Sequence, residues 1–284
     1  MSRRARLMLA GAGAATALLV LTWFLAFHVG FLRLADEKAL GGFLDLHRPR
    51  EDPIASFIAN LCNPQPYVYF VGAAVLLALA RRRPRVALTI GAIVLGANVT
   101  TQLLKPLLAD PRLAVPGTTP IAAASWPSGH ATAAMSLALC AVLAAPSRLR
   151  PAVAALGATF AVAVSYSFLT LGWHYPSDVF GGFLVALTWT LLGVAALSAV
   201  DARHPRRGGV ATGLIAERPS LRVALRPPVA ALAAAAALAG VLALARPAAV
   251  VSYTDAHTTF VVGAAAIGAF GLALATGMML ALRR

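Results

Sequence analysis

A histidine and an aspartate four positions apart, His174 and Asp178, lie at the start of a long apolar run. On or near a helix this spacing puts both side chains on one face, so that the carboxylate can hold one nitrogen of the imidazole ring. The other ring nitrogen then becomes a better nucleophile, which is the arrangement that covalent catalysis uses. A purely structural His–Asp pair is the alternative interpretation.

A second polar cluster, Ser128-Gly129-His130, leads directly into another apolar run. Ser128 can cap the helix, and Gly129 lets the backbone approach a ligand closely. The unpaired N–H groups of that first helical turn would then bind an anion, with the imidazole of His130 beside it. The alternative is an ordinary capped helix start with a histidine at the membrane interface.

Two cations, Lys105 and Arg112, flank a proline-containing segment at the end of a third apolar run. An ammonium group acts as a point charge and a guanidinium group as a planar fork, and both suit a phosphate group. Alternatively, both side chains extend to the lipid headgroups without a catalytic role. Taken together, the three clusters predict a site for phosphoryl transfer, provided that the fold brings them to one place.

The elements that must position these residues are expected to be membrane-spanning helices. Of the 284 residues, 60% are hydrophobic and only 12% are charged, whereas a soluble domain is roughly 25% charged. A soluble domain and a disordered chain are therefore both excluded. The formal net charge of +14 comes from short basic clusters between apolar runs, so no nucleic-acid binding is expected. Cys62 and Cys140 lie within apolar runs and are expected to be buried hydrophobic residues.

The predicted fold class is all-α, a polytopic transmembrane helix bundle with about eight spans of about 20 residues each. A six-helix core (1–200) precedes a basic cytoplasmic linker (201–227) and an additional C-terminal helix pair (228–284). A six-span count, with the last two helices misread, is the alternative. The expected spans run roughly over 7–30, 56–80, 86–104, 130–147, 151–172, 178–200, 228–246 and 257–281.

The orientation follows from the positions of the basic residues. With a cytoplasmic N-terminus, most of the 24 Lys and Arg residues fall in cytoplasmic segments, as the positive-inside rule requires. Both termini are then cytoplasmic, and all three polar clusters face the extracytoplasmic side of the plasma membrane. The first apolar run is too long for a signal-peptide core, so we expect it to stay as an anchor. Residues 32–55 have mixed charge and form either a solvated connector or a short amphipathic cover.

These motifs resemble those of the type 2 phosphatidic acid phosphatase (PAP2) superfamily, which also includes the vanadium haloperoxidases. That family has a Lys separated by six residues from Arg-Pro, then Pro-Ser-Gly-His, then Ser-Arg five residues before a His, with an Asp four positions later. The matching positions here are Lys105, Arg112, Pro127 to His130, His174 and Asp178. The resemblance covers roughly residues 35–200, and the combination of the second and third motifs is specific.

Two positions depart from the family pattern. Leu113 stands where the family has Pro, and Phe168 stands where the third motif has the Arg that normally holds the phosphate. A missing contact of this kind can remove several kcal/mol of transition-state stabilisation. Arg48 and Arg50 from the first outer segment are candidates to replace it; otherwise the activity is weak or changed.

The resemblance implies an integral membrane phosphatase acting on a lipid phosphate or pyrophosphate, of polyprenyl or phosphatidate type, without a metal or other cofactor. His174 would attack phosphorus to form a phosphohistidine, Asp178 would orient it, and His130 would act as acid and then as base. The alternatives are a phosphotransferase with the same intermediate and a catalytically weak protein that binds lipid phosphate or acts as a scaffold. The phosphoryl oxygens would be held by Lys105, Arg112, Ser128 and the backbone N–H of Gly129.

Overall fold

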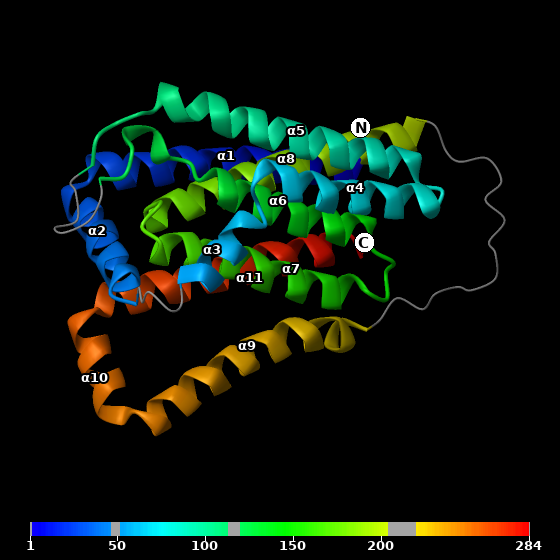
Figure 1. Cartoon of the computed structure of the whole chain (residues 1–284). Helices are drawn as coiled ribbons and strands as arrows, with labels where there is room; N and C mark the ends of the chain where they lie inside the picture. Colours follow the sequence, from blue (N-terminus) through cyan, green and yellow to red (C-terminus); the bar gives the residue numbers. More distant parts are fainter. Residues whose placement is uncertain (1, 47–51, 113–119, 204–219, 284) are drawn as a thin grey trace.

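The computed structural model describes residues 2–46, 52–112, 120–203 and 220–283, and within these it is all-helical (Figure 1). This confirms the predicted fold class. The helices are α1 (Arg3–His28), α2 (Gly30–Leu44), α3 (Asp52–Asn60), α4 (Pro64–Ala80), α5 (Pro84–Leu107), η1 (Ala123–Ser125), α6 (Gly129–Ala144), α7 (Arg150–Thr170), α8 (Pro176–Arg203), α9 (Leu221–Ala245), α10 (Pro247–Ala256) and α11 (Thr258–Ala281).

Among the described residues, seven helical segments are long and apolar enough to cross a membrane. They are α1, α5, η1 with α6, α7, α8, α9 and α11. The one predicted span that is not among these seven is 56–80. Its apolar helix α4 has only 17 residues. The chain is therefore a multi-pass membrane protein.

The prediction of one continuous helix over residues 56–80 was wrong, because the chain breaks between α3 and α4. Asn63 is extended (φ −63°, ψ 154°), and Pro64 begins α4. A proline ring disfavours helical geometry in the residue before it, which explains the break at this position. The apolar composition on both sides concealed it in the sequence.

The central helix is α6, which is the most buried of the candidate spans and contacts α4, α5, α7, α8 and α11. Its buried side chains are mostly small, and they let the neighbouring helices approach closely. The two cysteines, Cys62 and Cys140, are buried and form no disulfide, as the sequence analysis predicts. The core thus forms around the helix that begins with the second polar cluster.

The start of α6 is pressed against α8 at Gly182. A Cβ atom at this position would lie 2.7 Å from the backbone oxygen of Ser128 and 2.8 Å from the Cβ atom of Ala131. We therefore expect Gly182→Ala to destabilise the protein by about 1–3 kcal/mol, as overpacking does. Thermal unfolding in detergent measures this loss. Gly91→Ala is the matched control, because a Cβ atom there meets nothing within 4 Å; equal stability of the two variants would contradict the prediction.

The C-terminal part consists of two long apolar helices, α9 and α11, at the positions of the two predicted spans, with the short helix α10 between them. Figure 1 shows α9 diverging from the bundle and α10 turning the chain back into α11, which packs on α7 and α2. Of the predicted linker 201–227, the structure describes 201–203 and 220–227, and apart from Ser220 these are helical. Ser220 caps α9 by accepting a hydrogen bond from the backbone N–H of Val223.

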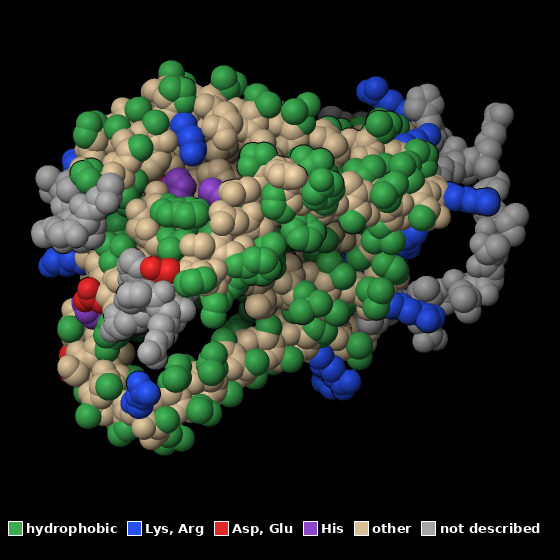
Figure 2. Space-filling view, in the orientation of Figure 1, with side chains coloured by type: hydrophobic (Ala, Val, Ile, Leu, Met, Phe, Trp, Pro, Cys, Tyr) green, Lys and Arg blue, Asp and Glu red, His purple; other side chains and the backbone are tan. Residues whose placement is uncertain are grey.

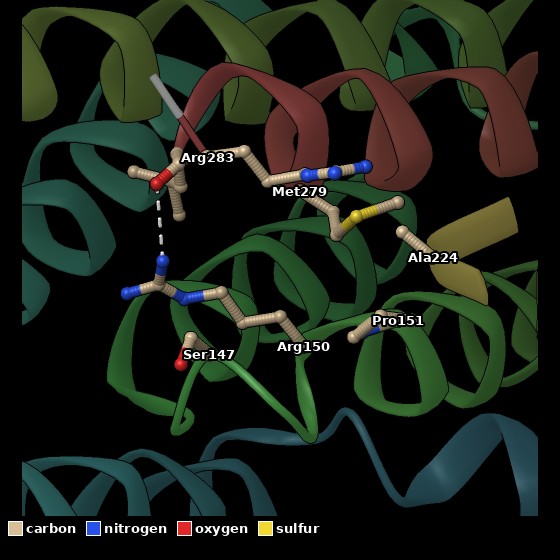
Figure 3. A pocket seen from close by; sticks show the side chains of 7 residues that line it. Ser147, Arg150, Pro151, Ala224, Met279 and Arg283 are labelled. Atoms are coloured by element: carbon tan, nitrogen blue, oxygen red, sulfur yellow. Dashed lines mark hydrogen bonds between the residues drawn. The ribbon is translucent and has the colours of Figure 1, made fainter. Parts of the chain in front are cut away.

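A small cavity of about 20 Å³ separates α7, α9 and α11 near the C-terminus (Figure 3). Arg150 lies beside it and donates a hydrogen bond of 3.1 Å to the carbonyl oxygen of Leu282. A volume of this size holds about one water molecule. This cavity is therefore a packing gap where α7 meets the last helices.

Candidate active site

Both chain ends lie at one end of the bundle, and the three polar clusters come together at the other (Figure 1). The backbone N–H of Ser128 donates to the carbonyl oxygen of Asp178 over 3.0 Å, which joins the start of α6 to the start of α8. Figure 2 shows two histidine side chains next to each other in a hollow at this end, beneath a basic side chain. The fold thus meets the condition that the phosphoryl-transfer prediction required.

His174 and Asp178 form the expected pair. The Nδ1 atom of His174 lies 3.0 Å from Oδ2 of Asp178, and both residues are buried. The same carboxylate oxygen accepts a hydrogen bond of 3.1 Å from the backbone N–H of Tyr175. Because Nδ1 faces the carboxylate, Nε2 is the nitrogen of His174 that is left to act as a nucleophile.

The first turn of α6 combines a helix N-terminus with a cation. Ser128 is fully buried, and its hydroxyl caps the helix by accepting from the N–H of Ala131 over 3.3 Å. Lys105 reaches over the next residue: a Cβ atom built on Gly129 would lie 3.9 Å from its Nζ atom. The positive end of the helix dipole and an ammonium group therefore point to the same small volume, as an anion site requires.

Gln102 is a polar neighbour of this turn that sequence reasoning missed. Its Nε2 atom lies as close to the Gly129 position as the Lys105 ammonium, at 3.9 Å from the built Cβ atom. Gln102 precedes Lys105 by three positions on α5, so both side chains lie on one face of that helix. That spacing is the signal that could have found it.

His130 completes the pocket together with two aromatic side chains. The Phe168 ring is fully buried and contacts both imidazoles, with centroid distances of 6.1 Å to His130 and 5.2 Å to His174. The Trp173 ring lies 5.6 Å from that of His130. Both imidazoles thus contact the same buried aromatic ring, that of Phe168.

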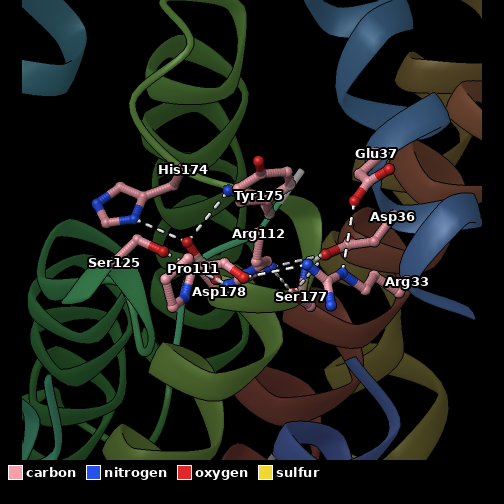
Figure 4. A network of polar contacts seen from close by, with 10 residues as sticks. All are labelled: Arg33, Asp36, Glu37, Pro111, Arg112, Ser125, His174, Tyr175, Ser177 and Asp178. Carbon is pink, nitrogen blue, oxygen red and sulfur yellow. Dashed lines mark hydrogen bonds and ion pairs between the residues drawn. The ribbon is translucent and has the colours of Figure 1, made fainter. Parts of the chain in front are cut away.

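Arg112 is placed differently from the other expected phosphate ligands. Its side chain is only 4% exposed, and its guanidinium bonds to the carboxylates of Asp178 and Asp36 (Figure 4). The rings of Phe27 and Tyr175 lie over its faces at 4.3 Å and 4.2 Å. The structure thus brings Arg112 into direct contact with the carboxylate that orients His174. Its two Nη atoms also donate to Ser177 (2.9 Å) and Ser125 (3.4 Å).

Asp36 is a site residue that the sequence did not reveal. Its Oδ2 atom accepts from Arg112 at 3.0 Å and from the hydroxyl of Ser177 at 2.6 Å, and its Oδ1 atom accepts from the backbone N–H of Ser177 at 2.9 Å. Helix α2, in the mixed-charge stretch 32–55, carries it into the site. No motif spacing links Asp36 to the other site residues, so only the tertiary structure could place it.

Burial raises the pKa of Asp36 from 3.8 to about 6, although the neighbouring Arg112 opposes this rise. A carboxyl group with a raised pKa stabilises the fold most when it is protonated, below its unfolded pKa, and this contribution is lost as the pH rises through about 6. We therefore expect the stability of the wild type, relative to Asp36→Asn, to fall between pH 4 and pH 7. Melting temperatures of both proteins over this range measure the effect; a constant difference would contradict it.

Three residues singled out in the sequence lie outside the described residues. They are Arg48 and Arg50, the candidates to replace the missing arginine, and Leu113, the departure in the first motif. Within the described part of the chain, Lys105 is the basic side chain beside the Gly129 turn, and Arg112 faces the two carboxylates.

Comparisons with known proteins concern the fold and the family of this chain. The chain resembles the crystal structure of a transmembrane PAP2-type phosphatidylglycerolphosphate phosphatase from Bacillus subtilis, with a TM-score of 0.55 and 20% sequence identity. The alignment covers 69% of this chain and 98% of that one, which shows a shared fold. A search of curated proteins found no match. The family model of the PAP2 superfamily matches residues 85–201. This matched segment carries both histidines, His130 and His174, and the aspartate that contacts one of them, Asp178.

Proposed function

We propose that this protein is an integral membrane phosphatase that hydrolyses a lipid phosphate or pyrophosphate through a phosphohistidine on His174. The observation that carries the proposal is the buried pair of His174 and Asp178 in the same pocket as His130. The match of residues 85–201 to the PAP2 family model supports the reaction class. A polyprenyl or phosphatidate-type lipid is the proposed substrate, because seven candidate spans place the protein in the bilayer with such lipids.

The proposed reaction has two steps at phosphorus. In the first, Nε2 of His174 attacks, the bond to the leaving oxygen breaks, and His130 donates a proton to that oxygen. Asp178 accepts a hydrogen bond from the Nδ1–H group and so stabilises the positive charge that develops on the attacking ring. In the second step His130 takes a proton from water, the resulting hydroxide attacks phosphorus, and the P–N bond breaks to release inorganic phosphate.

The phosphoryl oxygens would be held by Lys105 and by the N–H groups at the start of α6, including that of Gly129. Fixed positive groups of this kind stabilise the charge that develops in the transition state. Ser128 would contribute by holding the helix start in position. Arg112, also expected to hold phosphate, would act mainly through Asp178, because both of its Nη atoms already bond to protein oxygens.

We place the protein in the plasma membrane with both termini in the cytoplasm and the pocket on the extracytoplasmic side. Basic side chains gather around the end of the bundle where the chain ends lie (Figure 2), which supports this orientation. A headgroup would reach the histidines while the lipid tail stays in the hydrocarbon layer. Residues 1–200 would form the catalytic core, and the helices after residue 228 would be an addition to it.

The direct test is phosphate release by the purified protein in detergent, with a lipid monophosphate and a lipid diphosphate as substrates and EDTA present. We expect release that does not depend on metal and that vanadate blocks, because vanadate mimics the five-coordinate phosphorus. Release that requires an added metal ion would contradict the mechanism. Absence of release from both lipid classes would contradict the function.

The position of Phe168 favours a second candidate function, that of a lipid-phosphate binder or scaffold with weak catalysis. This fully buried ring contacts both histidines at the place of the family's arginine, so the pocket has one fixed positive charge fewer. Retention of a labelled lipid phosphate without phosphate release would support this candidate. Transfer of the label to a second lipid would instead identify a phosphotransferase.

A further inference from the structure

The break between α3 and α4 brings two asparagines to the pocket. The Oδ1 atom of Asn63 lies 2.9 Å from Nε2 of His130, and the Nδ2 atom of Asn63 donates to Oδ1 of Asn60 over 3.0 Å. Both asparagines precede the segment that matches the PAP2 family model. We infer that Asn63 is a positioning residue for His130, which it holds with a proton on Nε2, ready for donation to the leaving oxygen. This inference rests on the proposed function.

The direction of the first hydrogen bond follows from the second. Because the NH₂ group of Asn63 donates to Asn60, its carbonyl oxygen is the atom that faces His130. An amide oxygen can only accept a hydrogen bond, so Nε2 of His130 must carry the hydrogen. The asparagine pair thus fixes a hydrogen on Nε2. In its imidazolium form, with a second hydrogen on Nδ1, the ring can donate the Nε2 proton and become a neutral imidazole.

The local fold holds Asn63 in place without using its side chain. Its backbone N–H donates to the carbonyl oxygen of Asn60, and its own carbonyl oxygen accepts from the N–H of Tyr67, both over 3.0 Å. The side chain makes no capping hydrogen bond to α4, although asparagine is a favoured capping residue. The amide group is therefore available for His130, and removing it leaves the helix start intact.

The two histidines have partners that suit different tasks. His174 faces the carboxylate of Asp178, which stabilises a positive ring and so assists nucleophilic attack. His130 faces a neutral amide oxygen, which fixes the direction of the N–H bond but binds a cationic ring far less strongly than a carboxylate does. The ionisable groups that act on His130 are Lys105 and His174. A proton held by an amide can therefore pass to a substrate oxygen that approaches the same nitrogen.

The test compares two substrates that differ in their need for a proton. In an alkyl phosphate the leaving group is an alkoxide, which leaves poorly unless its oxygen is protonated. In p-nitrophenyl phosphate the leaving group is p-nitrophenolate, which leaves readily as an anion. We expect Asn63→Ala to lower kcat/KM for the alkyl lipid phosphate on the order of 10- to 100-fold, less than the roughly 10²–10⁴-fold that a general acid supplies. For p-nitrophenyl phosphate we expect a change below about threefold.

Two further variants separate positioning from folding. Asn60→Ala leaves Asn63 unchanged and is expected to lower the alkyl-phosphate rate selectively, by a smaller factor. Asn98→Ala is the matched control, because its amide contacts Val94 and Tyr67 rather than a histidine, and it should change neither rate selectively. An equal loss on both substrates, or no loss on either, would overturn the inference. Failure of the wild type to release phosphate from either substrate would instead overturn the proposed function.

Discussion

Replacement of His174 by alanine is expected to lower phosphate release from a lipid phosphate by at least about 10⁴-fold, because the nucleophile and the covalent intermediate are lost together. The fold should survive, since Asp178 keeps its contacts with Arg112 and with the backbone of Tyr175. Initial rates of phosphate release, measured beside the melting temperature, separate these two effects. Rates equal to those of the wild type would disprove the role of His174.

A matched control and a second readout make this test specific. His28→Ala removes an exposed imidazole whose recorded ring contacts are with Trp23 and Phe24, away from the candidate site, so it should keep the wild-type rate. When the reaction with a radiolabelled phosphate substrate is stopped rapidly without acid, the label should remain on the wild-type protein. The His174→Ala variant should carry no label. Label that persists on the alanine variant would place the covalent intermediate on another residue.

The three polar clusters of the candidate site could be predicted because each consists of residues close in sequence. The spacing of His174 and Asp178 on one helical face follows from local geometry, and the structure reproduces it with a 3.0 Å contact. The alternation of apolar runs then places every cluster at the same end of the bundle. Both steps require only helix periodicity and membrane thickness, which are strong signals in an apolar sequence.

Asp36 and Asn63 could not be predicted, because their roles depend on how distant helices pack. Asp36 reaches Arg112 across 76 positions of sequence, and Asn63 reaches His130 across 67. Neither residue belongs to a spaced motif, and each has ordinary alternatives as a solvated or capping side chain. The break before Pro64 was a readable signal, but the apolar residues on both sides favoured one continuous span.

The role expected for Arg112 shows how charge alone can mislead. A cation near two other clusters is naturally interpreted as a phosphate ligand, and the sequence contains no sign of the carboxylates that surround it. In the structure, Asp36 and Asp178 both bond to the guanidinium, which is 4% exposed. Arg112 is thus the cation that makes the burial of two carboxylates tolerable, and this explains why its removal should have a large effect on stability.

Arg112→Met is expected to destabilise the protein by about 3–5 kcal/mol, because it leaves two buried carboxylates without their cation. Asp178 would also lose the contact that fixes it behind His174, so phosphate release should fall with stability. Thermal and denaturant unfolding in detergent measure the loss. Arg85→Met is the matched control: its ion pair with Asp201 is solvent-exposed, and such pairs contribute at most about 1 kcal/mol.

The double variant Arg112→Met/Asp36→Asn decides whether the carboxylates cause this loss. Removing the charge of Asp36 leaves a single uncompensated carboxylate, so the double variant should be more stable than Arg112→Met alone. The two changes would then be strongly non-additive, as expected for residues in one buried network. Additive losses would mean that Arg112 stabilises the protein mainly through its packing between Phe27 and Tyr175. In that case the charge of Asp36 would contribute little through Arg112, and its hydrogen bonds with Ser177 would be what links α2 to α8.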